Sequence, residues 1–240
     1  MTALSKLSAD IDLNKLFDNL EINDIVKFVE CKEKIKGYSK KMDKKKRKKK
    51  VKKTFYNQAT IHIFHTNKIV NVKVFNNGKI QMTGLKFEKQ GKEVLNIVKD
   101  ILIEKNKGEI FDGKTLEITD YKIVLINSDF DIGYSVNREK LDREIIDMGL
   151  FSTYEPCMYP GVNIKYYFNT RYDKCGICKC ECKCDGKGEG LGNGDCKRVT
   201  VAVFASGKII ITGGKSNEQL VESYHFIKNV LKDKEKFHMK

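Results

Sequence analysis

The sequence lacks any apolar run long enough to cross a membrane, and its N-terminus lacks the basic start and apolar stretch of a secretory signal. A bilayer span needs ~20 apolar residues, and no stretch approaches that length. These two absences argue against a membrane protein and against secretion, so we expect a soluble intracellular protein. Hydrophobic residues still make up 40% of the 240 residues. This is enough for one large domain or two small ones with a real core.

Signatures of catalysis are also missing. GGKS at Gly213–Ser216 lacks the earlier glycine of a phosphate-binding loop, and a related stretch at Gly84–Phe87 reads GLKF. No cysteine and histidine form a local nucleophile signature, and no second catalytic domain fits in the chain. We therefore expect a protein that is not an enzyme.

Positive charge is concentrated in one tract. Lys40–Lys53 (KKMDKKKRKKKVKK) holds eleven Lys or Arg residues against a single Asp, and so carries most of the net charge of +14. A block of like charge with so few apolar residues cannot pack, which predicts a disordered loop. The tract favours contact with nucleic acid or nuclear targeting, because cations near a polyanion release counterions. The alternative is a solvated lysine tract without a partner.

Cysteine is unevenly distributed. Six of the eight cysteines crowd into one segment: Cys175, Cys178, Cys180, Cys182, Cys184 and Cys196. Without a secretion signal, disulfides are not expected. A C-x-x-C followed by three alternating cysteines offers several thiolates to one soft cation, so we expect zinc as one reading. No histidine lies in the cluster, and the second C-x-x-C of a zinc ribbon is missing. The other reading is a flexible, Gly-rich loop.

A duplicated unit organises the rest of the chain. Residues 72–102 and 201–231 align without a gap, with thirteen identities in 31 positions. VNVKVF (Val70–Phe75) and VTVAVF (Val199–Phe204) predict strands, because they are rich in β-branched residues. A turn with glycine, where a positive φ is cheap, and a return strand follow in each copy. A helix then follows, with apolar residues at helical spacing, and amphipathic helices are also predicted around Leu13–Leu20 and Leu141–Met148.

Each copy is therefore predicted as a strand, a helix, a run of antiparallel strands and a long helix. Further strands are expected at Ala59–Phe64 and Val162–Phe168. Helices segregated from an antiparallel sheet define an α+β fold. Both helices of a copy would cover one face of its sheet. The other face would stay open, and we expect it to be strongly apolar.

Three segments resemble the TATA-binding protein family. FASGKIIITGGKS (Phe204–Ser216) is similar to the family's hairpin-to-helix signature, FSTYEPCMYPGVNIKYYF (Phe151–Phe168) to the segment around its second stirrup, and SADIDLNKLF (Ser8–Phe17) to its opening strand and helix. The resemblance covers roughly 1–20, 55–170 and 197–235. It implies a pseudo-symmetric saddle whose curved sheet carries helices on its convex face, with repeats at 1–112 and 113–240. The basic insert (about 36–54) and the Cys/Gly-rich insert (about 171–197) would occupy corresponding parts of the two repeats.

The resemblance also implies a DNA surface. This family is itself a standard example of minor-groove binding: its aromatic side chains insert between base pairs as wedges and kink the duplex. By position, the hairpin wedges are Phe75 and Phe204, the second stirrup wedge is Tyr159, and its first-repeat partner is Phe55 or Tyr56. Thr83 and Thr212 match hydroxyls that face the groove. Lysines near phosphates would be Lys79, Lys208, Lys86 and Lys215. Glu155 matches a residue that docks transcription factor IIB. Alternatively, Phe75 and Phe204 are simply core residues.

Departures from the family pattern leave a second reading open. Where the family has Asn and Val on the central strand of each repeat, the second repeat has Leu125 and Asn127, and the first offers only Thr2. The resemblance implies a monomeric transcription initiation factor that binds and bends A·T-rich, TATA-like promoter DNA and recruits a factor-IIB-like protein and RNA polymerase machinery. It would act in the nucleus or, since the Lys/Asn/Ile-rich composition is typical of large DNA viruses, in a cytoplasmic viral factory. The runner-up is a protein-interaction platform that has lost DNA recognition, and a third reading is a metal-binding module.

Overall fold

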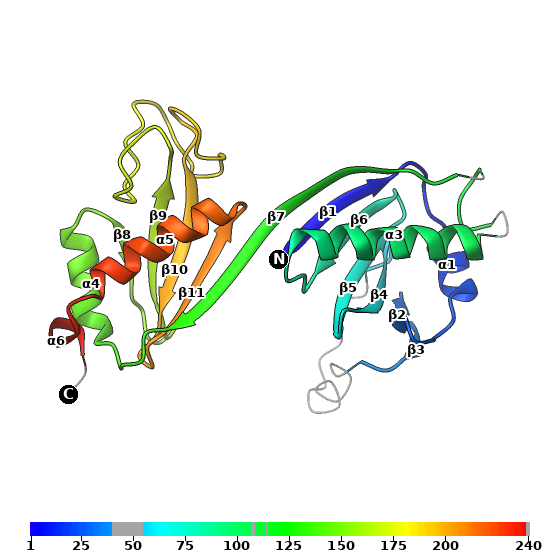
Figure 1. The fold of residues 1–240 in the computed structure, drawn as a ribbon, viewed down its shortest axis with the longest axis horizontal. Coiled ribbons are helices and arrows are strands. Elements are labelled where there is room, and N and C mark those ends of the chain that lie inside the picture. Colours follow the sequence, from blue (N-terminus) through cyan, green and yellow to red (C-terminus); the bar gives the residue numbers. More distant parts are fainter. Residues whose placement is uncertain (40–54, 107–108, 114, 239–240) are drawn as a thin grey trace. The chain divides into compact units, whose positions relative to one another are not determined.

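The computed structural model describes residues 1–39, 55–106, 109–113 and 115–238 (Figure 1). The lysine tract Lys40–Lys53 lies outside the described residues. The chain divides into two compact units, Met1–Val124 and Leu125–Lys240. Within the described residues, no helix combines the length and the apolarity needed to cross a membrane.

In its described residues, the first unit is an antiparallel sheet with helices α1 and α3. The sheet order is β3-β2-β4-β5-β6-β1, followed by the start of β7. The elements are β1 (Thr2–Leu7), α1 (Leu13–Asn19), β2 (Val26–Cys31), β3 (Lys34–Gly37), β4 (Gln58–His65), β5 (Lys68–Phe75), β6 (Lys79–Thr83), α3 (Glu88–Lys105) and β7 (Ile118–Asp131). Apolar side chains of alternate strand positions pack with those of α1 and α3 in one core. The two helices therefore cover one face of this sheet.

The second unit repeats this plan. Its sheet order is the end of β7, then β11-β10-β9-β8. The elements are α4 (Arg138–Asp147), β8 (Phe151–Thr153), β9 (Val162–Phe168), β10 (Lys197–Val203), β11 (Lys208–Gly214), α5 (Asn217–Val230) and α6 (Lys234–Phe237). Helix α5 packs on β9, β10 and β11, while α4 packs on β8 and β9. The α+β fold expected from the sequence is confirmed.

Local chemistry explains where the repeated elements turn and begin. Gly78 and Gly207 adopt φ of 73° and 85° in the two equivalent hairpin turns, a conformation that costs glycine little. At the start of each long helix, a buried glutamine accepts from the backbone N–H four residues earlier: Gln90 from Lys86 at 2.9 Å and Gln219 from Lys215 at 2.7 Å. This shared polar contact supports the duplication beyond the apolar pattern.

The two insertions do not occupy equivalent places, which corrects the sequence analysis. The Cys-rich segment joins β9 to β10, whereas the corresponding strands β4 and β5 are joined by a tight turn at Thr66 and Asn67, both with positive φ. The segment that contains the lysine tract joins β3 to β4 instead. Strand β3 also includes residues 36 and 37, which had been expected to lie in the insert. The compact units divide within β7, and the repeat boundary expected between residues 112 and 113 stays a prediction.

Candidate nucleic-acid interface

The open face of the second unit is the sheet surface opposite the helices. Side chains alternate along each strand, so the register identifies them. Val199, Val201 and Val203 of β10 are fully buried on the helix side. The positions between them form two cross-strand rows on the open face: Lys165–Thr200–Thr212 and Asn163–Ala202–Ile210–Asp129.

The first unit presents equivalent rows. Register pairing places them as Phe28–His62–Asn71–Thr83–Thr2 and Glu30–Thr60–Lys73–Gln81–Leu4. The Phe28 and His62 rings lie 4.7 Å apart, and the side-chain amide nitrogen of Asn71 lies 3.0 Å from Nε2 of His62. The members of these rows on β5 and β6 align with those on β10 and β11 at the offset of the sequence repeat.

The composition of both open faces differs from the expectation of a strongly apolar surface. Each unit combines apolar side chains with cations, amides and hydroxyls, and each carries one carboxylate in its second row, Glu30 or Asp129. Burial, and then the charge of Arg198, lower the pKa of Lys165, which donates to the hydroxyl of Thr200 at 3.1 Å. Sequence reasoning missed Lys73, Lys165 and Asp129. Lys73 lies between the buried Val72 and Val74, and Lys165 between the buried Ile164 and Tyr166, so the period-2 alternation could have identified both lysines. The position of Asp129 follows from the register of β7 against β11.

Two of the expected wedge residues lie together in the second unit. The rings of Tyr159 and Phe204 are 5.8 Å apart in an edge-to-face arrangement. Gly161 lies beneath both, since a Cβ there would approach Cε1 of Tyr159 at 3.0 Å and Cε1 of Phe204 at 3.2 Å. Tyr159 is 39% exposed. Their role toward DNA stays a prediction.

The second stirrup is the loop between β8 and β9, residues 154–161, and it carries Tyr159. Hydrogen bonds within the loop and from helix α4 hold its backbone. The backbone carbonyl of Glu155 accepts from the N–H groups of Met158 and Tyr159, both at 2.9 Å. The guanidinium of Arg138, at the start of α4, donates to the carbonyl of Pro160 and lies over the ring of Tyr154 at 5.0 Å. The side chain of Glu155 is exposed. These contacts hold the backbone on both sides of Tyr159 and leave the Glu155 carboxylate accessible.

In the first unit, Phe75 is half-buried at the end of β5, opposite Gln58. Phe55 and Tyr56 precede β4 and are 63% and 67% exposed. The structure does not select one of the two as the counterpart of Tyr159.

The central-strand residues of the second unit form a polar pair. The hydroxyl of Thr212 donates to Oδ1 of Asn127 at 2.6 Å. Because Oδ1 is engaged, the amide nitrogen of Asn127 remains as the pair's outward donor. Leu125 lies two residues earlier on β7 and is partly buried. Thr83, the counterpart of Thr212, is paired in register with Thr2.

The candidate phosphate lysines are not alike. Lys79, Lys208 and Lys86 are exposed. Lys215 forms an ion pair with Glu189 of the Cys-rich segment, and the side-chain amide of Gln219 donates to the backbone carbonyl of the same glutamate at 2.9 Å. The Cys-rich segment therefore contacts the start of α5, and its Glu189 carboxylate neutralises the charge of Lys215.

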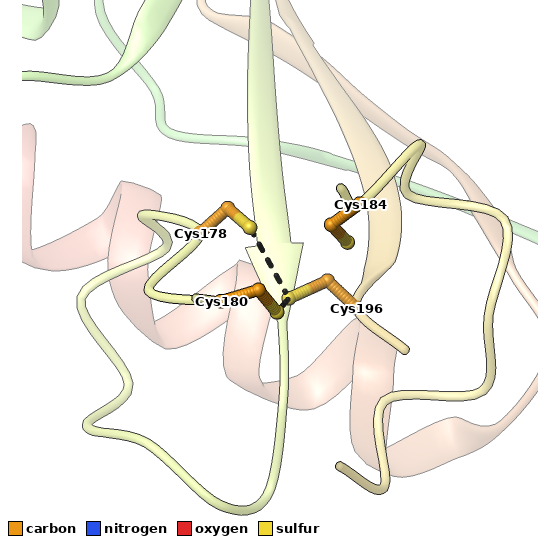
Figure 2. Close-up of side chains that lie close together, drawn as sticks. All are labelled: Cys178, Cys180, Cys184 and Cys196. Carbon is orange, nitrogen blue, oxygen red and sulfur yellow. Dashed lines mark hydrogen bonds between the residues drawn. The ribbon is translucent and has the colours of Figure 1, made fainter. Parts of the chain in front are cut away.

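Four of the six clustered cysteines converge (Figure 2). The Sγ atoms of Cys178, Cys180, Cys184 and Cys196 all lie within 4.8 Å of one another. Cys196 lies 3.4 Å from Cys180 and 3.7 Å from Cys178. Tetrahedral zinc with Zn–S bonds of ~2.3 Å separates its sulfurs by ~3.8 Å, so four thiolates in this arrangement fit that cation.

The other two cysteines lie outside this cluster, which corrects the six-residue ligand set. Cys182 is exposed, and the thiol of Cys175 donates to Asp173 at 3.3 Å. Only the second cysteine of the C-x-x-C therefore joins the cluster. Burial raises the pKa of the Cys196 thiol well above its ordinary value. A cation would have to displace this proton, so its affinity would depend on pH.

Hydrogen bonds anchor the segment around the cluster. Asp195 accepts from the N–H groups of Leu191 and Glu189 at 3.0 and 3.1 Å, and these bonds lower the pKa of its carboxyl group. The amide of Asn169 donates to the carbonyl of Gly192 and to Sγ of Cys196. Burial raises the pKa of Tyr166 to about 12, so its hydroxyl stays protonated and can donate to the carbonyl of Lys174. These contacts favour an ordered segment over the flexible loop.

Sequence comparison finds similarity between this chain and TATA-binding proteins. Residues 120–234 match the family described as transcription factor TFIID, or TATA-binding protein. A TATA-box-binding protein-like protein of Acanthamoeba polyphaga mimivirus is 33% identical over 195 residues, which is 75% of this chain and 48% of that protein. The Saccharomyces cerevisiae TATA-box-binding protein is 25% identical over 162 residues, 67% of this chain and 51% of that protein. The chain spans about half the length of these curated relatives.

The fold comparison covers almost the whole chain. The Methanococcus jannaschii TATA-binding protein superposes with a TM-score of 0.52 at 21% identity, over 97% of this chain and 95% of that one. The proteins of this family are DNA-binding factors without enzymatic activity, in agreement with the missing catalytic signatures. With its duplicated unit, its helix-covered antiparallel sheets and these matches, the chain belongs to the TATA-binding protein family.

Proposed function

We propose that this protein is a transcription initiation factor that binds A·T-rich, TATA-like promoter DNA through the minor groove, bends it and recruits transcription machinery. The observation that carries the proposal is the contact between the rings of Tyr159 and Phe204. Tyr159 comes from the connection between β8 and β9 and Phe204 from that between β10 and β11, and both rings pack close to Gly161. Two adjacent, partly exposed rings are suited to enter a base step from the minor groove.

The mechanism is deformation without covalent chemistry. Unstacking a base step costs a few kcal/mol, and contacts that exist only on kinked DNA offset this cost. The open faces supply such contacts. The amide nitrogen of Asn127, held by Thr212, is a donor for the N3 and O2 acceptors that A·T pairs present in the minor groove. Exposed lysines such as Lys79 and Lys208 would approach phosphates.

Recruitment of a factor-IIB-like protein, and through it of RNA polymerase machinery, would use the second stirrup. The Glu155 carboxylate is exposed there, beside Met158, which is 82% exposed. A rigid turn with an accessible carboxylate and an apolar side chain has the mixed character of a protein-binding surface. A monomer acting in the nucleus or in a cytoplasmic viral factory fits this role.

We further propose that Cys178, Cys180, Cys184 and Cys196 hold one structural zinc ion. Four protein thiolates would fill its coordination sphere, which is typical of structural and not of catalytic zinc. The ion would fix the connection between β9 and β10 and would supply no chemistry to DNA binding. Cys175 and Cys182 are not part of this set.

A protein-interaction platform remains the second candidate, because carboxylates occupy both open faces. Glu30 and Asp129 lie in register with groove-facing positions. A carboxylate approaching DNA is repelled by phosphates and accepts hydrogen bonds only. A chain that had lost DNA recognition would tolerate such residues without further adaptation.

Binding and bending of DNA distinguish the two candidates. Affinity would be measured at several salt concentrations on A·T-rich and G·C-rich duplexes, and bending by energy transfer between labelled duplex ends. The proposal expects tighter binding and a bend on the A·T-rich duplex. Phe204→Ala and Tyr159→Ala should remove the bend with little loss of thermal stability, whereas a truncated core phenylalanine costs ~3–5 kcal/mol.

Phe87→Ala is the matched control, because Phe87 is an exposed aromatic residue that precedes α3 and lies outside the sheets. This variant should bend DNA like the wild type. Two outcomes would contradict DNA bending and favour the protein-interaction platform. In one, both wedge variants unfold; in the other, the wild type binds DNA but bends no duplex.

A further inference from the structure

Asp129 breaks the equivalence of the two open faces. On β7 it is paired in register with Ile210, while the corresponding row of the first unit pairs Leu4 with Gln81. Gln81 and Ile210 are equivalent positions of the duplicated unit. The second unit therefore carries a carboxylate at the place where the first carries an apolar side chain.

The side chain of Asp129 belongs to the open face. Its neighbours Ser128 and Phe130 are paired with the buried residues Ile211 and Ile209, and the Phe130 ring contacts Tyr224 of helix α5 at 4.9 Å. Asp129 is exposed and, among the described residues, its carboxylate has no hydrogen bond or ion pair. It lines a depression of about 480 Å³, together with Asn127, Phe204, Lys208 and Ile210 among others.

The chemistry of the minor groove restricts what this carboxylate can contact. A·T and T·A pairs present only acceptors there, and guanine adds the single donor, its N2 amino group. An ionised carboxylate is an acceptor only. Desolvating it against an A·T pair would leave a charge without a partner, which is costly. Against a G·C pair, the amino group supplies the missing donor.

We propose that Asp129 reads the N2 amino group of guanine, so that the half-site under the second unit contains a G·C pair. This inference rests on the proposed DNA binding and deepens it. In the equivalent row, the first unit offers the donors Lys73 and Gln81 on β5 and β6, which match the acceptors of A·T pairs. Its own carboxylate, Glu30, lies on β2, three strands away from Gln81. The binding site is therefore asymmetric, and Asp129 helps to fix the direction in which the protein lies on the duplex.

The test uses inosine, which is guanine without the N2 amino group. Duplexes bound by the wild-type chain would first be selected from a random pool at fixed salt. Each guanine of the selected site would then be replaced by inosine, one at a time. An inosine·cytosine pair has an A·T-like minor groove and is easier to deform, so a protein that reads only shape should bind it equally well or more tightly. We expect the opposite at one position, a loss of roughly tenfold.

Three variants assign the effect to the side chain. Asp129→Ala should bind the guanine and inosine duplexes equally, and Asp129→Asn, which keeps an acceptor and gains a donor, should show a reduced preference. Asp131→Ala is the matched control, because it removes the same charge two residues away, where the carboxylate accepts from the N–H of Gly133 at 2.8 Å. It should keep the full preference for guanine.

The outcomes separate this inference from the proposed function. Selection of sites made only of A·T pairs, or binding and bending that is indifferent to inosine, would overturn the role of Asp129 and leave the promoter-binding function in place. Equal loss of preference in Asp129→Ala and Asp131→Ala would overturn it in favour of a general charge effect. Absence of binding to any duplex would remove the proposed function and this inference with it.

Discussion

The hydroxyl of Thr212 donates to Oδ1 of Asn127 at 2.6 Å and so determines which end of that amide faces outward. The two residues come from β11 and β7, at a point where the register shifts between Ile211 and Gly214. An amide held in this way presents a donor, and A·T pairs offer only acceptors in the minor groove. A single hydrogen bond within the protein would thereby tune the second unit for A·T contacts.

Thr212→Val tests this relationship, because valine keeps the shape and removes the hydroxyl. Asn127 could then turn its oxygen outward, where it would meet an acceptor. We expect affinity for an A·T-rich duplex to fall by ~1 kcal/mol, about fivefold, with little change in thermal stability. Titration at fixed salt measures this. Thr83→Val, at the equivalent position of the first unit, is the control for losing a hydroxyl. An equal loss in both variants would contradict a special role for the Thr212–Asn127 pair.

Gly161 gives a graded test of the aromatic pair. A Cβ at this position would approach the rings of Tyr159 and Phe204 at 3.0 and 3.2 Å, so the rings must move by a few tenths of an ångström. We expect Gly161→Ala to reduce DNA bending and Gly161→Val to reduce it further, while the melting temperature changes little because the rings are partly exposed. Energy transfer between duplex ends reports the bend. Normal bending by the valine variant would mean that the orientation of the pair does not matter.

The lysine tract predicts a change in salt dependence. Replacing Lys40–Lys53 with a Gly/Ser linker of equal length removes most of the excess charge and keeps the connection between β3 and β4. We expect the fold to persist, non-specific DNA affinity to fall and the plot of log affinity against log salt to flatten. Circular dichroism checks the fold, and titrations over a salt series give the slope. An unchanged slope would show that the tract does not contact DNA.

Much of the fold follows from the sequence because local pattern and global structure agree. The alternation Val70-x-Val72-x-Val74 followed by Gly78 at a positive φ favours a hairpin, and the second copy of the pattern forms the same hairpin. The long helices follow in the same way from their 3.6-residue period. Tyr159 and Phe204 could be paired only through the family resemblance, since no local pattern brings residues 45 apart together.

The remaining features depend on register and on loop paths, which local patterns do not encode. Asp129 lies on the open face because it is opposite Ile210, and a slip of one residue would turn it to the other face. Spacing alone could not separate Cys178 from Cys175, because the path of the connection decides which thiols meet. The two insertions were wrongly given equivalent places, since the sequence repeat does not extend into them.

The metal proposal predicts which thiols matter. Protein purified under reducing conditions should contain about one zinc per chain by elemental analysis, and Cys180→Ser should reduce this content strongly. Without the ion, the connection between β9 and β10 should open to proteases while the sheet remains folded, because loops can loosen without exposing the core. Cys182→Ser is the matched control, since Cys182 is exposed and outside the cluster. Equal zinc loss in both variants, or metal-free wild type, would contradict the four-cysteine site.

The contact between Glu189 and Lys215 predicts that the Cys-rich connection moderates DNA binding. Glu189→Gln removes the charge that competes for Lys215, while its backbone carbonyl can still accept from Gln219. If Lys215 contacts a phosphate, the released lysine should steepen the slope of log affinity against log salt by about 1. The affinity gain should be only a few-fold, because an exposed ion pair contributes ~1 kcal/mol or less.

Glu104→Gln controls for the change in net charge, because Glu104 pairs with Lys105 at the end of helix α3. It removes the same charge without releasing a candidate phosphate lysine, and its slope should match that of the wild type. Lys215→Ala combined with Glu189→Gln should also return the slope to the wild-type value, since the released cation is then absent. Equal slopes in the two glutamate variants would mean that Lys215 does not contact the phosphate backbone.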